Sequence, residues 1–151
     1  MDKSYKLIDS GDFEKLELWG GVILVRPDPQ AIWKKSLGQE EWQKADAVFD
    51  KGWKFKKELP KSWKVEVGGL IFGIALSNFK HTGVFPEHQS NWEWLSSQII
   101  NHKSKIINLF GYTGGASLTS AKAGAEVVHV DASKVSVEKA RENAELSGLK
   151  D

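Results

Sequence analysis

Apolar and polar positions alternate through much of residues 5–76, and this period of two predicts a β-rich region. The segment KLELWGGVILVRPDP contains two such runs joined at Gly20-Gly21, which is the sequence signal of a β-hairpin. The segment WKVEVGGLIFGIAL repeats this arrangement around a second Gly-Gly pair. Between the two, PQAIWKKSLGQEEWQKADAVF predicts one or two helices interrupted at Gly38. We therefore expect one small α+β domain in this region.

Residues 77–105 form a bridge with a different pattern. A Thr-Gly turn is followed by Pro86, which the first turn of a helix tolerates because its missing N–H would have no partner inside the helix. Trp92, Leu95 and Ile99 then recur at helical spacing. We expect a helix of about four turns that leads into the next strand.

From Ile106 onward the pattern becomes β-α-β-α. The expected elements are a strand over 106–110, a helix over 116–123, a strand over 127–130 and a helix over 135–146. Both strands are apolar on both faces, which is typical of a parallel sheet with helices packed above and below. A right-handed crossover brings the C-terminal ends of the strands side by side, where open α/β sheets bind ligands.

Composition narrows the chemistry. The 151 residues include no cysteine, which excludes a disulfide, a thiolate metal site or a cysteine nucleophile in this chain. The four histidines, at positions 81, 88, 102 and 129, are too scattered for a metal site, so no metal is expected. No apolar run reaches the length of about 18 residues that spans a bilayer, and the polar start lacks the apolar segment of a signal peptide. We expect a cytoplasmic protein without a membrane partner.

The net charge of +1 gives no general attraction to nucleic acid, but residues 51–64 carry six lysines against a single Glu58. Aromatic side chains among these lysines could stack bases while the ammonium groups contact phosphates. The interpretation we favour is that alternation points Trp53 and Phe55 into the core and the lysines into water. The candidate contacts with RNA are Trp53, Lys54, Lys56, Lys57 and Trp63.

The turn after the first parallel strand reads FGYTGG and predicts a cofactor site. It lacks the G-x-G-x-x-G spacing of a dinucleotide site, and no Gly-Lys-Ser/Thr follows to make a P-loop. A ligand without a diphosphate, such as S-adenosylmethionine, fits better, because its carboxylate can meet backbone amides near a helix start. Asp131 lies 20 residues after Gly111, at a spacing that places a carboxylate beside a ribose. The alternatives are that the glycines only form a tight turn and that Asp131 is a helix N-cap.

The stretch IINLFGYTGGASL, with AGAEVVHVDASKVSVEKARENAELSGL after it, resembles motif I and the following acidic loop of class I S-adenosylmethionine-dependent methyltransferases. It is most similar to the branch related to bacterial 23S ribosomal RNA large-subunit cytosine-C5 methyltransferases. KHTGVFPEHQ resembles that branch's segment just before motif I. The resemblance implies S-adenosylmethionine as cofactor, RNA as substrate and a Rossmann-like sheet.

By that resemblance, three groups of residues surround the cofactor. Six lie around its methionine half: Asn108, Phe110, Gly111, Tyr112, Thr113 and Gly114. Asp131 takes the ribose, with Ala132 and Ser133 near the adenine. Thr82, Gly83 and Phe85 close the pocket from the bridge.

The resemblance also implies a domain plan. Residues 1–76 are a β-rich domain expected to engage substrate, residues 77–105 a linker and helix that close the pocket, and residues 106–151 the start of an incomplete methyltransferase domain. The substrate-contacting Asp/Asn-Pro-Pro motif of that family and the cysteine that cytosine methylation requires have no counterpart here, so no catalytic residue is assigned.

We therefore expect the chain alone to be the N-terminal half of such an enzyme. Its first parallel strand should present an unpaired apolar edge, which makes it marginally stable, a weak binder of cofactor and inactive by itself. Two alternatives stay open, a nicotinamide-dependent oxidoreductase fragment and a non-catalytic RNA-binding module.

Overall fold

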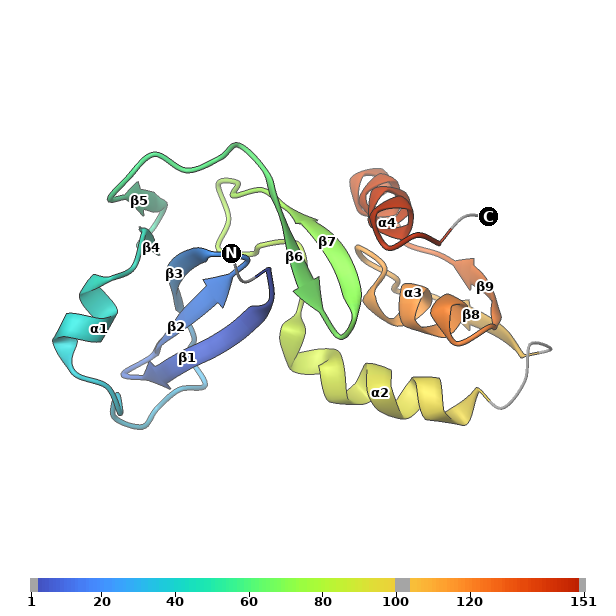
Figure 1. The fold of residues 1–151 in the computed structure, drawn as a ribbon, viewed down its shortest axis with the longest axis horizontal. Coiled ribbons are helices and arrows are strands. Elements are labelled where there is room, and N and C mark those ends of the chain that lie inside the picture. Colours follow the sequence, from blue (N-terminus) through green and yellow to red (C-terminus); the bar gives the residue numbers. More distant parts are fainter. Residues whose placement is uncertain (1–2, 100–103, 150–151) are drawn as a thin grey trace. The chain divides into compact units, whose positions relative to one another are not determined.

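The chain divides into two units in the computed structural model, in which residues 3–99 and 104–149 are described (Figure 1). The first unit contains residues 1–65 and 74–82, and the second contains 66–73 and 83–151. This division differs from the expected boundaries at residues 76 and 105, because the tip of the second hairpin is hydrogen-bonded to the last helix. The expected outer limits at residues 1 and 151, part of the bridge, and His102 lie outside the described residues.

The first unit is built on a mostly antiparallel sheet. Its strands, in spatial order, are β1 (Tyr5–Gly11), β2 (Glu14–Trp19), β3 (Val22–Pro27), β4 (Ala47–Phe49) and β5 (Trp53–Phe55). Only the β3–β4 pair is parallel, and a short helix, α1 (Gln39–Gln43), precedes β4. The hairpin predicted at Gly20-Gly21 is confirmed: both glycines have positive φ, +59° and +92°, as a two-residue turn requires.

The second predicted hairpin is also present, as β6 (Trp63–Val67) and β7 (Leu70–Ile74). Gly68 and Gly69 form its turn with φ of +59° and +72°. The predicted helical stretch before β4 is reduced to the five residues of α1, with Gly38 as its N-cap. The alternation and the glycine pairs therefore identified the strands of both hairpins, whereas β4 lies at the end of the stretch that was predicted to be helical.

Both faces of the β1–β3 sheet carry buried side chains. On one face Leu16 and Val25 pack with Trp42 of α1 and with Ala45. On the other face, Trp19 and Leu24 are fully buried beside an ion pair between Glu17 and Arg26. A sheet of this size is stable only when apolar area is covered in this way.

The favoured interpretation of residues 51–64 is wrong for Phe55. Its ring is 56% exposed, although Trp53 on the same face of β5 is half-buried and donates an indole hydrogen bond to the Phe79 carbonyl at 3.2 Å. β5 has three residues and pairs only with β4, so it forms an edge of the sheet. The alternation correctly predicted that Phe55 and Trp53 share a face of β5, but among the described residues none covers that face at Phe55.

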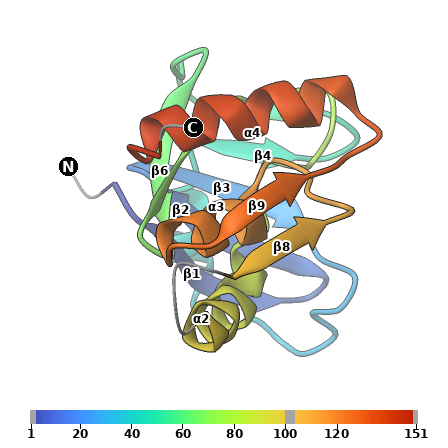
Figure 2. The ribbon, with the colours of Figure 1, turned by 90° about the vertical axis from the view of Figure 1, so that its right-hand side faces the viewer.

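The second unit contains the β-α-β-α region and the helix that precedes it. Its elements are a 3₁₀ turn η1 (Pro86–His88), α2 (Gln89–Gln98), β8 (Lys105–Asn108), α3 (Gly115–Lys122), β9 (Glu126–His129) and α4 (Lys134–Leu146). The last four lie within two residues of their predicted ranges, whereas α2 has ten residues and is shorter than the expected four turns. Strands β8 and β9 are parallel and point the same way, with Asn108 beside His129 at their C-terminal ends (Figure 2).

Helices were expected on both faces of the β8–β9 pair. One face meets α3, because Asn108 and His129 both lie within hydrogen-bond distance of Ser117. On the opposite face Ile107 is 62% and Val128 54% exposed, and none of the described residues covers them. The described part of the sheet therefore has a single covered face.

Trp92 connects three elements of this unit. Its indole stacks on Phe72 of β7 with ring centroids 6.0 Å apart, and it lies against Gly115 at the start of α3. A Cβ on Gly115 would be 2.2 Å from the Trp92 ring, so α2 and α3 can approach this closely only because residue 115 is glycine. This packing fixes α2 opposite the turn that follows β8.

Candidate functional site

The turn between β8 and α3 is held by a hydrogen bond to the residue after β9 and by its own backbone conformation. The Gly111 N–H donates to the Val130 carbonyl at 2.9 Å, which ties the end of β8 to the end of β9. Gly114 has a φ of +102° and is the N-cap of α3, where a side chain would be strained. Tyr112 also has a positive φ, +48°, which is uncommon for a residue with a large side chain and is frequent at functional sites.

Gly111 is in close contact with His129. A Cβ on Gly111 would lie 2.2 Å from Cε1 of the imidazole, so no other residue fits without movement. The ring itself is fixed, because Nδ1 of His129 is 2.9 Å from the Ser117 hydroxyl, which also accepts a hydrogen bond from the Asn108 amide at 3.0 Å. His129 therefore packs under the turn.

Asp131 joins the turn to the loop after β9. One carboxylate oxygen accepts from the Tyr112 N–H at 2.8 Å, and the other accepts from the Ser133 N–H at 2.8 Å. These two hydrogen bonds hold the pKa of Asp131 below its ordinary value, and the bond from Ser133 has the larger effect. The carboxylate is therefore ionised at neutral pH. The alternative in which Asp131 caps α4 is wrong: the N-cap is Ser133, whose hydroxyl accepts from the Ser136 N–H.

Thr113 is held from two directions by residues of the same unit. Its hydroxyl donates a short hydrogen bond to the Gly83 carbonyl, and its carbonyl accepts from the Asn143 amide at 2.9 Å. Asn143 is 1% exposed, and its side-chain oxygen Oδ1 accepts from the Gly73 N–H at 2.9 Å. Asn143 was not predicted as a site residue; its one signal in the sequence is a polar residue in line with Ser136 and Ala140 on the buried face of α4.

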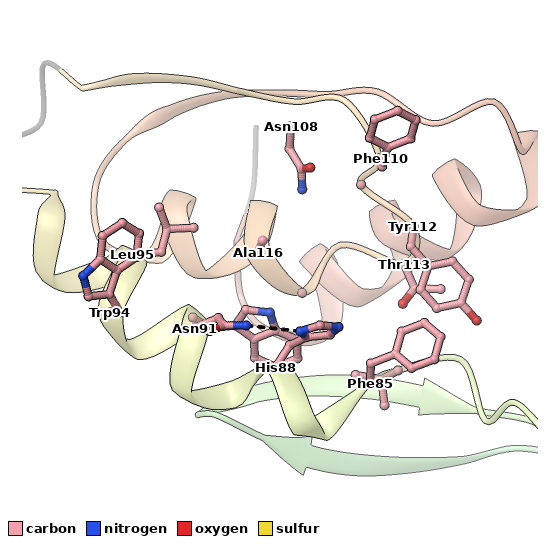
Figure 3. A pocket seen from close by; sticks show the side chains of 14 residues that line it. Phe85, His88, Asn91, Trp94, Leu95, Asn108, Phe110, Tyr112, Thr113 and Ala116 are labelled. Carbon is pink, nitrogen blue, oxygen red and sulfur yellow. Dashed lines mark hydrogen bonds between the residues drawn. The ribbon is translucent and has the colours of Figure 1, made fainter. Parts of the chain in front are cut away.

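A cavity of about 560 Å³ opens beside this turn (Figure 3). One wall is the end of β8, the turn and the start of α3; the other is η1 and α2. Six of the expected cofactor residues line it: Phe85, Asn108, Phe110, Gly111, Tyr112 and Thr113. The volume is within the range of ordinary ligand pockets, about 300–1,000 Å³.

The other six expected residues do not line this cavity. The Gly83 carbonyl accepts from the Thr113 hydroxyl, Gly114 is the N-cap of α3, and the Asp131 carboxylate accepts from the Tyr112 N–H behind the turn. Ala132 and Ser133 are exposed on the loop before α4. Thr82 is buried in the first unit, and its hydroxyl has no hydrogen-bond partner within residues 3–99 and 104–149.

The cavity is aromatic and uncharged. Phe85 and Tyr112 pack with ring centroids 5.2 Å apart, and the exposed ring of Phe110 stands on the same side (Figure 3). No Asp, Glu, Lys or Arg is among its described lining residues. Five lining residues of η1 and α2 were not predicted as site residues: His88, Asn91, Trp92, Trp94 and Leu95. Such a surface suits planar rings and a cationic sulfonium better than a phosphate.

Across the described ranges no three His, Asp or Glu side chains gather closely enough to hold a metal ion. Nor does any helix there have the length and apolarity needed to cross a bilayer.

Comparison with known proteins gives a consistent result. A family model described as S-adenosylmethionine-dependent methyltransferase matches residues 26–151. A solved structure of a SAM-dependent methyltransferase from Agrobacterium tumefaciens is 45% identical and superposes with a TM-score of 0.89 over 97% of this chain and 49% of that one.

Curated relatives point the same way. The Ribosomal RNA large subunit methyltransferase K/L of Shewanella loihica is 35% identical over 142 residues, 85% of this chain and 18% of that protein. The Ribosomal RNA large subunit methyltransferase I of Aeromonas salmonicida is 35% identical over 86 residues, 56% of this chain and 21% of that protein. This chain thus spans about half of the Agrobacterium structure and about a fifth of each of these curated relatives.

The expected class I methyltransferase architecture, the glycine turn at the end of β8 and the match over residues 26–151 agree, and the chain belongs to the S-adenosylmethionine-dependent methyltransferase family.

Proposed function

We propose that the cavity beside the glycine turn binds S-adenosylmethionine and that the protein transfers its methyl group to RNA. The observation that carries the cofactor assignment is the cavity itself, formed where β8 ends and α3 begins and lined by Phe85, Tyr112 and the Gly111 backbone. An uncharged, aromatic wall suits the sulfonium and thioether part of this cofactor. Asp131, ionised and beside the turn, supplies an acceptor for the ribose hydroxyls.

A nicotinamide dinucleotide is the competing ligand, because its folds share this topology. Its pyrophosphate needs a close backbone approach from a second glycine of the turn, where this chain has Thr113. The described lining residues include no Lys or Arg that could bind the pyrophosphate in place of that backbone contact. Calorimetric titration with S-adenosylhomocysteine should give saturable binding, while NADH should give none. Tighter binding of NADH than of S-adenosylhomocysteine would favour the alternative of a nicotinamide-dependent oxidoreductase.

Substitution of Asp131 by alanine should raise the dissociation constant of S-adenosylhomocysteine at least about tenfold, since one charge-assisted hydrogen bond to the ribose is lost. The hydrogen bond from the Tyr112 N–H to the Asp131 carboxylate is lost as well. Glu138→Ala, which removes an exposed acid from α4, is the matched control. An unchanged titration for Asp131→Ala would remove this residue from the site.

The pH dependence of that binding follows from the lowered pKa of Asp131. A carboxyl with a lowered pKa stays ionised until the pH falls below its ordinary value, so Asp131 should not weaken binding between about pH 8 and pH 5. Loss of affinity attributable to Asp131 should begin only in more acidic solution.

RNA is the proposed methyl acceptor. The two curated relatives described above are named as ribosomal RNA large subunit methyltransferases, which supports this class of substrate. Phe110, 90% exposed, and Trp94, 64% exposed, line the cavity and offer ring surfaces on which a base could stack. The expected cytoplasmic location remains a prediction from the sequence.

We also propose that the first unit contacts RNA around β5. The five residues expected there are largely engaged: Trp53 and Trp63 donate their indole N–H groups to backbone carbonyls, Lys54 and Lys57 pair with Asp50 and Asp46, and Lys56 donates to the Gln43 carbonyl. Phe55 and Phe79, 56% and 70% exposed, are the better stacking candidates.

The RNA surface can be tested by binding at several salt concentrations. Phe55→Ala and Phe79→Ala should weaken binding of a single-stranded RNA without changing its salt dependence, because stacking involves no counterion release. Ile32→Ala, which trims an exposed apolar side chain on a different loop, is the control. Binding that is equally strong in all three variants would argue against this surface.

A further inference from the structure

A second cavity, of about 480 Å³, lies in the groove between α2 and α3, which are neighbours in the second unit (Figure 1). The turn of the β6–β7 hairpin contributes Gly68 to its lining. Among the described lining residues only Trp92 also lines the cofactor cavity. The groove is therefore distinct from the proposed cofactor site.

The α3 wall of this groove presents hydrogen-bond donors. Thr119 and Lys122 are three residues apart, so they lie on one face of α3. Thr119 is 9% exposed, and its hydroxyl has no hydrogen-bond partner among the described residues. A bound ligand or water would explain such an unsatisfied hydroxyl in a cavity wall. The Lys122 ammonium donates to the Gly69 carbonyl at 2.6 Å and has two further protons to donate.

The α2 wall presents a carboxylate and a hydroxyl. Glu93 and Ser96 are also three residues apart and share a face of α2. One oxygen of Glu93 accepts from the Gln89 amide at 3.0 Å, which leaves the other oxygen to accept from a ligand. Glu93 and Lys122 form no ion pair with each other or with any other residue in the described ranges. The groove therefore offers a cation with donors on one wall and an anionic acceptor on the other.

We propose that this groove binds the sugar–phosphate backbone of an RNA strand, an assignment that rests on the proposed function, in which RNA is the methyl acceptor. A ribonucleotide has a phosphate that accepts hydrogen bonds and a 2′-hydroxyl that donates one. Lys122 and Thr119 bind the phosphate, and Glu93 accepts from the 2′-hydroxyl. The negative charge of Glu93 keeps the phosphate on the α3 wall. DNA has no 2′-hydroxyl, so the carboxylate makes the groove selective for RNA.

The test measures binding of a single-stranded RNA and of a DNA with the same sequence by fluorescence anisotropy at several salt concentrations. A sequence of A and C alone makes the 2′-hydroxyl the only difference between the strands. Lys122→Gln should weaken binding of both strands about fivefold at low salt and reduce the salt slope by about 0.7, as for one phosphate contact on a single strand. Thr119→Val, which removes only the hydroxyl, should weaken both about threefold.

Glu93→Ala should weaken binding of RNA about fivefold without weakening binding of DNA, because only RNA loses a hydrogen bond. Lys134→Gln and Glu138→Ala are the matched controls, since they remove a charge of either sign from α4, outside the groove. If Glu93→Ala binds both strands more tightly, the carboxylate only repels nucleic acid, and the assignment is overturned.

Titration with S-adenosylhomocysteine separates a local effect from a loss of fold. Each groove variant should bind it as the wild-type protein does, and a parallel loss of this ligand and of RNA would mean that the side chains only support the fold, which overturns the assignment. Wild-type RNA affinity and salt slope in all three groove variants would overturn the assignment and leave the proposed function intact. A wild-type protein that binds S-adenosylhomocysteine but no RNA would overturn RNA as the methyl acceptor, and the assignment with it.

Discussion

Replacing Gly111 with alanine is expected to weaken binding of S-adenosylhomocysteine about a hundredfold. The new methyl carbon would lie 2.2 Å from Cε1 of His129, so either the turn or the ring must move by more than an ångström. The ring cannot yield easily, because its Nδ1 is 2.9 Å from the buried Ser117 hydroxyl. The turn moves instead, and it carries Tyr112 and Thr113, which line the cavity. Calorimetric titration of the variant measures the loss directly.

A second substitution tests whether that clash is the cause. Gly111→Ala combined with His129→Ala removes the ring that the new methyl group would strike, and it should recover a large part of the affinity. Gly52→Ala is the control for the substitution type, since nothing lies within 4 Å of a Cβ at that position. If the double variant binds as weakly as Gly111→Ala while His129→Ala alone binds well, the contact is not what makes glycine necessary at position 111.

The sequence was most informative where structure depends on neighbours along the chain. Glycine pairs between alternating runs located both hairpins, and the change of period at Ile106 located β8, α3, β9 and α4 to within two residues. Hydrophobic periodicity is a local property, so these predictions required no knowledge of the tertiary fold. The glycine turn was found in the same way.

The errors and omissions concern faces and distant partners. Periodicity shows that Trp53 and Phe55 share a face, but not that β5 is an edge strand whose face is left uncovered at Phe55. It shows that His88 and Asn91 are neighbours on a helix, but not that this helix borders a cavity. Asn143 bonds to residues 30 and 70 positions away, and no pattern within α4 indicates such partners.

Removing the Arg26 side chain should have the largest effect on the stability of the first unit. Arg26→Ala should lower its free energy of unfolding by about 3–5 kcal/mol, because the carboxylate of Glu17 would stay buried without its main partner. Glu17 is fully buried and receives two guanidinium hydrogen bonds, from Nε at 2.7 Å and from a terminal nitrogen at 2.8 Å. The third guanidinium bond, to the Lys80 carbonyl at 3.0 Å, would be lost as well.

Amide hydrogen exchange in β2 and β3 measures this loss, and exchange in α4 of the second unit gives a reference within the same molecule. The double variant Glu17→Leu/Arg26→Met separates two explanations. Exchanging both charges for apolar side chains leaves no isolated carboxylate, so it should be considerably more stable than Arg26→Ala alone. The Tyr5 hydroxyl, 3.0 Å from Glu17, and Lys15 Nζ at 4.0 Å remain near the carboxylate in the single variant. If Arg26→Ala proves no less stable than the double variant, those two groups are sufficient to stabilise Glu17, and the guanidinium contributes mainly through its packing over the Trp19 ring, 5.0 Å away.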